Sequence, residues 1–170
     1  PIGLFALISA LNKGAQVYVA DILDGRLQKA LEFGAKGVIN SAKTDIKEES
    51  MRITGGDGFD CCIEACGQSV TFLNCIDCCA FAGNIILIGN GKKETTFLHS
   101  ILLKKELNVF GSRNSYPSDF KDVIELISSG KVDVLKMVSD IYPMDEADKA
   151  FKALANNNGE LCKVLVRIAD

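Results

Sequence analysis

The fold is decided by the opening stretch of the chain, PIGLFALISALNKGAQVYVADILDGR, which runs from Pro1 to Arg26. Its apolar run, Ile2 to Leu11, carries small residues at three- and four-residue steps, which predicts a helix lying close against a sheet. Gly14 is placed to end this helix, and the β-branched run Val17 to Ala20 predicts a short strand. Asp21 follows directly, so an acidic residue is expected at the tip of that strand.

A helix, a glycine turn and a strand that ends on an acid are typical of a dinucleotide-binding unit. The helix N-terminus offers free N–H groups and a positive dipole end to a pyrophosphate. Asp21 follows Gly3 at close to the Rossmann spacing of about 20 residues, where an acid accepts hydrogen bonds from the adenosine ribose. A phosphate on that ribose would be repelled by Asp21, so the pattern favours NAD over NADP. An ordinary helix and strand of an α/β scaffold remains the alternative, because only the last glycine of a G-x-G-x-x-G motif could be present.

Several blocks along the chain resemble, in order, those of the medium-chain, zinc-dependent alcohol and polyol dehydrogenases (sorbitol, threonine and galactonate/gulonate types). The blocks are Pro1-Ile2-Gly3, Asp21 with Arg26, Asp60 to Gly67 (DCCIEACG), Gly83 to Gly89 (GNIILIG) and Gly111-Ser112-Arg113-Asn114. The resemblance covers the whole chain. It implies the cofactor-binding C-terminal half of such an enzyme, with the catalytic lobe, its zinc ligands and the first Rossmann strand outside this sequence.

The same resemblance implies a set of cofactor-binding residues, which are Ile2, Gly3, Asp21, Arg26, Cys66, Gly67, Ile88, Gly89 and Arg113. Ile2 and Gly3 would close the phosphate turn, and Arg26 would lie near the adenosine. Alternatives stay open from the residues themselves: Arg26 could be a solvated surface arginine, Gly89 an ordinary turn glycine, and Arg113 a surface side chain bonded to the chain's own carbonyls. No residue is expected to act as a catalytic group or as a metal ligand.

Composition excludes several partners. The chain has 170 residues with 48% hydrophobic content, which is enough to bury a core. Its net charge of −3, with Lys and Arg interspersed among acids, leaves no basic face for nucleic acid or an anionic membrane. The apolar opening lacks a cationic leader and is too short to span a bilayer. We therefore expect a cytoplasmic protein with a small-molecule substrate.

The cysteines and the histidine also bear on function. Seven cysteines sit within apolar segments, which favours reduced thiols over a disulfide framework. Cys75-x-x-Cys78 with Cys79 could suggest a metal site, but a second pair is lacking, so buried thiols are the preferred interpretation. His99 is the only histidine and lies among apolar residues, so a structural role is expected for it.

The chain in order predicts an α/β fold: a Rossmann-type doubly wound parallel sheet lacking its first strand, with a C-terminal extension of helices and a strand. The expected domains are residues 1–112, a partial NAD-binding Rossmann domain, and residues 113–170, which would pack on the missing lobe. Beyond the opening unit, the expected helices are Asp24 to Phe33, Asp45 to Thr54, Ser69 to Phe81, one from Ser118 or Asp119 that stops at Gly130, and Asp145 to Ala155. The expected strands are Gly37 to Asn40, Phe59 to Glu64, Ile85 to Ile88, Lys104 to Phe110 and Lys163 to Ile168.

The function implied is hydride transfer from a secondary alcohol of a polyol or sugar acid to NAD, with zinc present only in the intact protein. This chain alone is expected to be inactive. The intact protein is expected to be a homodimer or homotetramer, with strands near Ile85 to Ile88 and Leu107 to Phe110 joining across a two-fold axis. Two rivals remain, which are a zinc-free, NADP-dependent quinone or enone reductase of the same superfamily and a non-catalytic nucleotide-binding module.

Overall fold

The computed structural model describes residues 1–169 and divides into two compact units. One unit is Ile2–Asn114, and the other comprises the residues from Ser115 onward. Among residues 1–169, no helix combines the length and the apolar character needed to cross a membrane.

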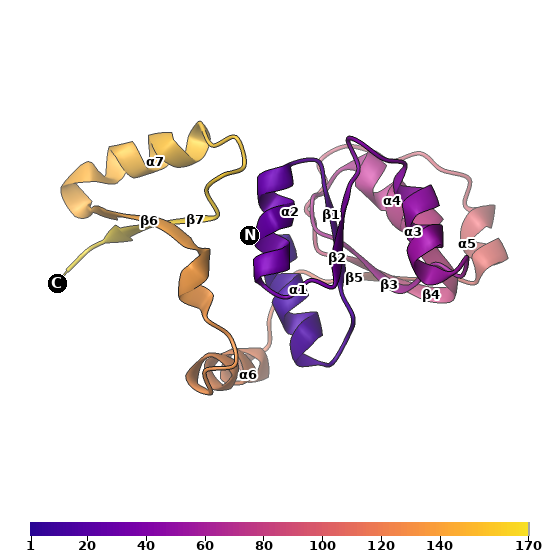
Figure 1. Cartoon of the computed structure of the whole chain (residues 1–170), viewed down its shortest axis with the longest axis horizontal. Coiled ribbons are helices and arrows are strands. Elements are labelled where there is room, and N and C mark those ends of the chain that lie inside the picture. Colours follow the sequence, from indigo (N-terminus) through magenta and orange to yellow (C-terminus); the bar gives the residue numbers. More distant parts are fainter. Residues whose placement is uncertain (170) are drawn as a thin grey trace. The chain divides into compact units, whose positions relative to one another are not determined.

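The first unit alternates helices and strands along the chain. Its elements are α1 (Ile2–Asn12), β1 (Tyr18–Asp21), α2 (Asp24–Glu32), β2 (Gly37–Asn40), α3 (Ile46–Thr54), β3 (Phe59–Glu64), α4 (Ser69–Cys78), β4 (Cys79–Leu87), α5 (Ser100–Lys105) and β5 (Asn108–Gly111). Every strand pair in the unit is parallel. Figure 1 shows α1 and α2 on one side of the strands and α3 and α4 on the other. The predicted doubly wound α/β class is confirmed.

The strands of this unit form two sheets, with β1 paired to β2 and a second sheet in the order β3-β4-β5. Where the sheets approach, the rings of Tyr18 on β1 and Phe59 on β3 lie 5.6 Å apart between centroids. In the Rossmann order 3-2-1-4-5-6, the first strand separates the two halves of the sheet. The break between β1 and β3 falls at that position, which agrees with the expectation of a sheet lacking its first strand.

The core of the first unit consists of two apolar clusters. One is built on Leu7, Ala30 and Ala35, and the other on Ile76, Cys79 and Ile85. In α1 the buried residues are Leu7 and Ile8, whereas Gly3 is exposed with no atom within 4 Å of where a Cβ would stand. The expectation that the small-residue stripe faces the sheet is therefore wrong at Gly3, because large aliphatic side chains gain more from burial than a glycine does.

Two regions of the first unit differ from the prediction by more than one residue. Helix α4 ends at Cys78, not Phe81, and β4 already begins at Cys79. Cys79 pairs with Phe59, and the register then shifts before Asn84 pairs with Cys61, with Ala82 at a positive φ of 56°. A run of small apolar residues suits a helix and a buried strand equally, so its periodicity could not locate this change.

The second difference is at Lys104 and Lys105, which end helix α5 and do not begin a strand. The Lys105 ammonium donates to the carbonyl oxygens of Ile76 at 2.7 Å and Asp77 at 3.2 Å. These bonds satisfy two carbonyls near the end of α4. Strand β5 starts later, at Asn108, and all of its residues are exposed.

The second unit contains α6 (Pro117–Ser128), a 3-10 turn η1 (Val134–Met137), β6 (Val138–Pro143), a 3-10 turn η2 (Met144–Glu146), α7 (Ala147–Ala155) and β7 (Lys163–Arg167). Strands β6 and β7 are parallel, and α7 connects and contacts both. Strand β6 was not predicted. Its burial lacks a regular alternation, which explains the missing signal.

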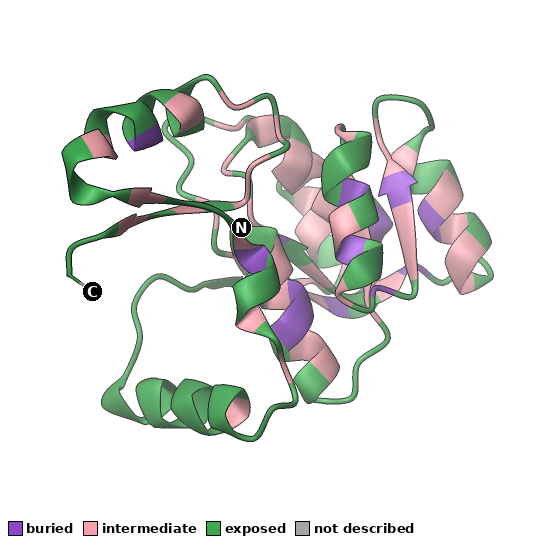
Figure 2. Ribbon diagram, turned by 60° about the vertical axis from the view of Figure 1, so that its left-hand side comes forward, coloured by how far each residue is buried: buried purple, intermediate pink, exposed green. Residues whose placement is uncertain are grey.

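Helix α6 begins two or three residues earlier than expected, because its N-cap is Tyr116 and not Ser118 or Asp119. The Asp119 carboxylate instead accepts the Tyr116 N–H at 2.7 Å. None of the residues of helix α6 is buried, and Figure 2 shows that this helix is exposed along nearly its whole length.

Candidate dinucleotide-binding site

The candidate site lies in the first unit, where β1, β3 and β4 reach their carboxyl ends. Asp21 ends β1, Glu64 ends β3, and Ile88 and Gly89 follow β4 directly. In open α/β sheets this edge carries the ligand, at the point where the strand order reverses. The break between β1 and β3 is that point.

The Asp21 carboxylate is held by backbone N–H groups of the two residues that follow it. Its Oδ1 accepts the N–H of Ile22 at 2.8 Å and that of Leu23 at 3.1 Å. Its Oδ2 lies 3.5 Å from Nη1 of Arg26, whose side chain is 52% exposed against 19% for Asp21. One carboxylate oxygen therefore faces only a loosely held cation, and an incoming pair of hydroxyl donors could replace that contact.

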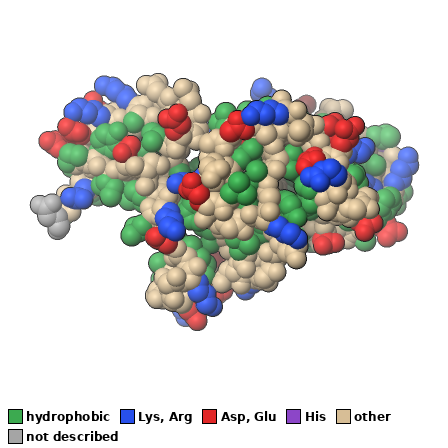
Figure 3. Space-filling view, in the orientation of Figure 1, with side chains coloured by type: hydrophobic (Ala, Val, Ile, Leu, Met, Phe, Trp, Pro, Cys, Tyr) green, Lys and Arg blue, Asp and Glu red, His purple; other side chains and the backbone are tan. Residues whose placement is uncertain are grey.

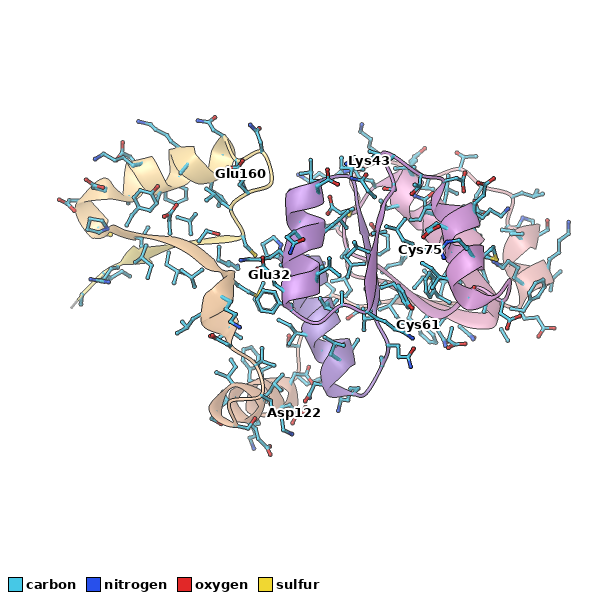
Figure 4. All side chains as sticks on the ribbon, viewed as in Figure 1. Glu32, Lys43, Cys61, Cys75, Asp122 and Glu160 are labelled. Carbon is cyan, nitrogen blue, oxygen red and sulfur yellow. The ribbon has the colours of Figure 1, made fainter. Side chains whose placement is uncertain are left out.

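A second polar cluster borders Asp21 at the end of β2. Asn40 is paired in register with Asp21, and its amide donates to Oδ1 of Asp24 at 2.6 Å. Lys43, labelled in Figure 4, donates to Oδ2 of Asp24 at 2.5 Å. The bonds from Lys43 and Asn40 hold the pKa of Asp24 below its usual value. Lys43, which follows the end of β2, is thus bound to Asp24. This pairing joins two separate segments and was not predicted from the sequence.

Glu64 is the buried charged residue of this site and was not among the predicted site residues. Its side chain is 4% exposed. Oε1 accepts the N–H groups of Cys66 and Gly67, both at 2.8 Å, and the Thr71 hydroxyl at 2.6 Å, while Oε2 lies 3.1 Å from the Gly67 nitrogen. The only sequence signal was an acid at the end of an apolar strand, directly before Ala65-Cys66-Gly67.

Gly67 and Gly89 meet backbone to backbone. A Cβ on Gly89 would stand 2.2 Å from the Gly67 nitrogen and 2.3 Å from Oε2 of Glu64. Gly67 has a φ of +71°, and a Cβ there would stand 2.8 Å from the backbone of Asn90 and Gly91. These two positions accept no larger residue without movement of the backbone.

Cys66 lies beside the charges of this edge and is an exposed residue overall. Partial burial of the sulfur raises its pKa, the charges of Glu64 and Asp21 raise it further, and Arg26 opposes them. The structure thus brings Asp21, Arg26 and Cys66 into one neighbourhood, although they come from two different segments.

The remaining predicted residues lie at the borders of the unit. Ile2 and Gly3 form the exposed first turn of α1. Ile88 is 36% exposed, and its N–H donates to the Glu64 carbonyl at 2.9 Å, as that of Gly89 does at 3.0 Å. Arg113 lies on the exposed segment after β5, where it makes no ion pair with any of residues 1–169.

The residues present do not fit a zinc ion. Within residues 1–169, no group of three His, Cys, Asp or Glu side chains is arranged to hold a metal. Cys75, labelled in Figure 4, packs with Cys62 and Cys79 in the apolar core. The hydrogen bond that Cys62 shares with Cys75 raises the pKa of Cys62, and the hydrogen bond that Cys79 donates to Cys62, together with burial, raises the pKa of Cys79, so the thiols of Cys62 and Cys79 stay protonated. Neutral thiols are poor zinc ligands.

A cavity of about 350 Å³ lies elsewhere, where β1 and β2 begin, and is lined by Tyr18, Lys36, Gly37, Val38, Glu49, Arg52 and Ile53. Its cations are already engaged, because Lys36 donates to Gln16 and Arg52 is paired with Glu49. This cavity lies where strands begin, whereas Asp21 and Glu64 are the last residues of their strands. On the face of the molecule shown in Figure 3, acidic and basic side chains are interspersed and form no basic patch.

The sequence profile of the family described as zinc-binding dehydrogenase matches residues 1–129 of the chain. This chain belongs to the zinc-binding dehydrogenase family. The resemblance drawn from the sequence blocks is confirmed.

Relatives of this zinc-binding dehydrogenase chain include a sorbitol dehydrogenase of Halalkalibacterium halodurans, 32% identical over 100% of the chain and 50% of that protein. Among solved structures, an Escherichia coli oxidoreductase/dehydrogenase of unknown specificity is 30% identical with a TM-score of 0.92, covering 99% of this chain and 48% of that one. An E. coli alcohol dehydrogenase solved in complex with NADH is 26% identical with a TM-score of 0.89, covering 99% and 50%. The chain spans about half the length of these relatives.

Proposed function

We propose that this chain is the NAD-binding half of a zinc-dependent oxidoreductase that transfers hydride from a secondary alcohol of a polyol or sugar acid to NAD. The observation that carries the proposal is Asp21, an acid held by its own backbone at the carboxyl end of β1, beside the break in the sheet. A carboxylate at that place accepts hydrogen bonds from a free ribose diol and repels a ribose phosphate. The solved relative that contains NADH supports the same cofactor.

The residues of this edge fit a dinucleotide. Asp21 and Arg26 would hold the adenosine ribose, and the exposed first turn of α1 at Ile2 and Gly3 would receive the pyrophosphate. Gly67 and Gly89 let the backbones of the turns after β3 and β4 lie directly against each other at this edge. NAD, when bound, supplies the acceptor for a hydride.

The chain alone is proposed to be inactive, because the zinc ligands of the intact enzyme would come from residues outside it. We also propose that the chain itself binds NAD weakly, because Pro1-Ile2-Gly3 would supply only the last part of the phosphate turn that the family resemblance implies. We also propose a cytoplasmic location, which suits cysteines that are all free among the described residues.

The cofactor assignment is tested by titrating the chain with NADH and NADPH, with and without Asp21→Ser. We expect the native chain to bind NADH more tightly, and the substitution to reduce that preference because the repulsion of a ribose phosphate is removed. Asp57→Ser, which removes an exposed acid from a loop, is the control and should leave the preference unchanged. A native preference for NADPH would refute the assignment and favour the reductase alternative.

The substrate class rests on Arg113, whose guanidinium is exposed and free of ion pairs within residues 1–169. A guanidinium at the edge of a cofactor domain can bind a carboxylate through two parallel hydrogen bonds. In the intact enzyme, we expect hexonates to be oxidised better than the matching neutral polyols, and Arg113→Lys to raise KM more for the acid. Equal activity on both substrate classes, unchanged by the substitution, would exclude this role.

A further inference from the structure

Two acids and two cations gather where β1 and β2 reach their carboxyl ends, and each acid is paired with one cation. Oδ2 of Asp21 lies 3.5 Å from Nη1 of Arg26. Oδ2 of Asp24 lies 2.5 Å from Nζ of Lys43, which is labelled in Figure 4. The four charges sum to zero, so an anion that binds at this edge must compete with a carboxylate for either cation.

The second pair is tied to Asp21 through the backbone. Asn40 is paired in register with Asp21, and the next residue, Ser41, donates its N–H to the Asp21 carbonyl at 3.1 Å. The Lys43 N–H donates to the Asn40 carbonyl at 3.0 Å, and the Asn40 amide donates to Oδ1 of Asp24 at 2.6 Å. Since neighbouring strands lie about 4.8 Å apart, Lys43 belongs to a turn fixed directly beside the end of β1.

A ribose phosphate at the end of β1 would require a cation. In dinucleotide-binding sheets, a basic side chain near this strand tip accommodates the phosphate of NADP. Lysine binds phosphate as a point charge on a flexible stem, so Lys43 could serve in this way. Asp24 opposes that role twice, because it pairs with the ammonium and adds a negative charge beside Asp21.

We propose that Asp24 is a second specificity-determining residue for the cofactor: it pairs with Lys43, so that this ammonium is not available to a ribose phosphate. The proposal rests on the proposed NAD-binding function. It divides the preference for NAD between two acids, because loss of Asp21 frees only Arg26, whereas Lys43 stays engaged until Asp24 is also neutralised.

The test titrates the 170-residue chain with 5′-AMP and with 2′,5′-ADP, which differ only by the phosphate on the ribose 2′-oxygen. The variants are Asp21→Ser, Asp24→Asn and the two combined. The combined variant should bind 2′,5′-ADP, relative to 5′-AMP, about five-fold better than Asp21→Ser does, which is the scale of an exposed ion pair. Asp24→Asn alone should gain less, because Asp21 still repels the phosphate.

Two further variants identify the cation. Adding Lys43→Met to the combined variant should remove the gain that Asp24→Asn produces. The side chains of Asp24 and Lys43 are both more than half exposed, so neither substitution opens a cavity. The gain should also shrink at high salt, because the freed charge is screened.

Asp148→Asn is the matched control, added to Asp21→Ser. Like Asp24, Asp148 lies in the first turn of a helix and pairs with an exposed lysine, Lys152, at 3.1 Å, but it belongs to the second unit. This substitution removes the same charge and should leave the ratio of the two affinities unchanged.

The outcomes separate this proposal from the proposed function. If 5′-AMP binds but the combined variant shows the same ratio as Asp21→Ser, the role of Asp24 is excluded while the cofactor site stands. A gain that survives Lys43→Met, or an equal gain from Asp148→Asn, excludes it as well. If the native chain binds neither nucleotide, the proposed function fails, and this proposal fails with it.

Discussion

At the scale of single residues, the site depends on positions that tolerate no added atoms. Gly89 is the sharpest case, because a Cβ there would overlap both the Gly67 nitrogen and the Glu64 carboxylate. The sequence showed only a glycine after an apolar strand, which is as common in ordinary turns. Its importance comes from the neighbour that approaches it.

We expect Gly89→Ala to lower the free energy of unfolding by about 1–3 kcal/mol, the usual cost of forcing extra atoms into a packed site. Gly111→Ala is the matched control, since no atom lies within 4 Å of a Cβ at that position. Urea denaturation of both variants measures the difference. Equal stability of the two would show that the turns separate easily, contrary to the close contact described.

A second residue-scale prediction concerns the thiol of Cys66. Its pKa is raised by burial and then by the charges of Glu64 and Asp21, so neutralising Asp21 should lower that pKa and increase the thiolate fraction at pH 8. We expect Asp21→Asn to speed alkylation of Cys66 by at least about two-fold.

Site-resolved mass spectrometry of the alkylated chain provides the measurement. Cys61 is the internal reference, because it is also exposed and its pKa is raised by burial and by Cys79 and Asp60, not by Asp21. A parallel change at Cys61, or slower alkylation of Cys66, would contradict the placement of Asp21 beside that thiol.

At the scale of elements, the helices are ended by local chemistry that the sequence already displays. Helix α3 shows this at both ends: Asp45 accepts the Glu48 N–H at 2.9 Å, and Gly55 adopts a left-handed φ of 69°. Both ends were predicted within one residue. Where such signals are missing, as between α4 and β4, the predicted boundary was wrong.

Asp45→Ala is expected to lower the free energy of unfolding by about 1 kcal/mol, because it removes the side-chain acceptor from the first turn of α3. Asp57→Ala removes another exposed acid, from the loop after this helix, and should have almost no effect. Chemical denaturation of the two variants at neutral pH tests the difference. A cost at Asp57 equal to that at Asp45 would mean that net charge, not capping, is responsible.

At the scale of the whole molecule, only one of the two strands expected to join across a two-fold axis has a free edge. Strand β4 is paired on both sides, to β3 and to β5, whereas β5 is the outer strand of its sheet and is exposed throughout. An exposed strand edge readily pairs with another chain. We therefore assign the proposed homodimer contact to β5 alone.

Val109→Lys places a charge on that edge and should shift the intact protein from dimer to monomer at micromolar concentration. Val70→Lys, a comparable change at a valine that is 61% exposed on α4, should leave the mass unchanged. Light scattering after size exclusion reports the mass. A dimer that survives Val109→Lys, or a native protein that is already monomeric, would rule out the edge contact.

The sequence by itself determined the features that depend on local interactions. The alternation of helices and strands, the glycines that end helices and Asp21 at the tip of β1 all follow from residues a few positions apart, because capping and backbone preference act over one turn. The family blocks added the protein family, which the profile match confirmed.

The tertiary structure alone decided which distant residues meet. Nothing in the chain order shows that Asp24 binds Lys43, that Gly67 lies against Gly89, or that Glu64 is buried beneath two turns. Burial of a charge is stable only where several donors from separate segments converge on it, and that convergence is a property of how the strands pack. The candidate residues could be found in the sequence, but the contacts of Glu64 with Cys66 and Gly67 could be found only in the fold.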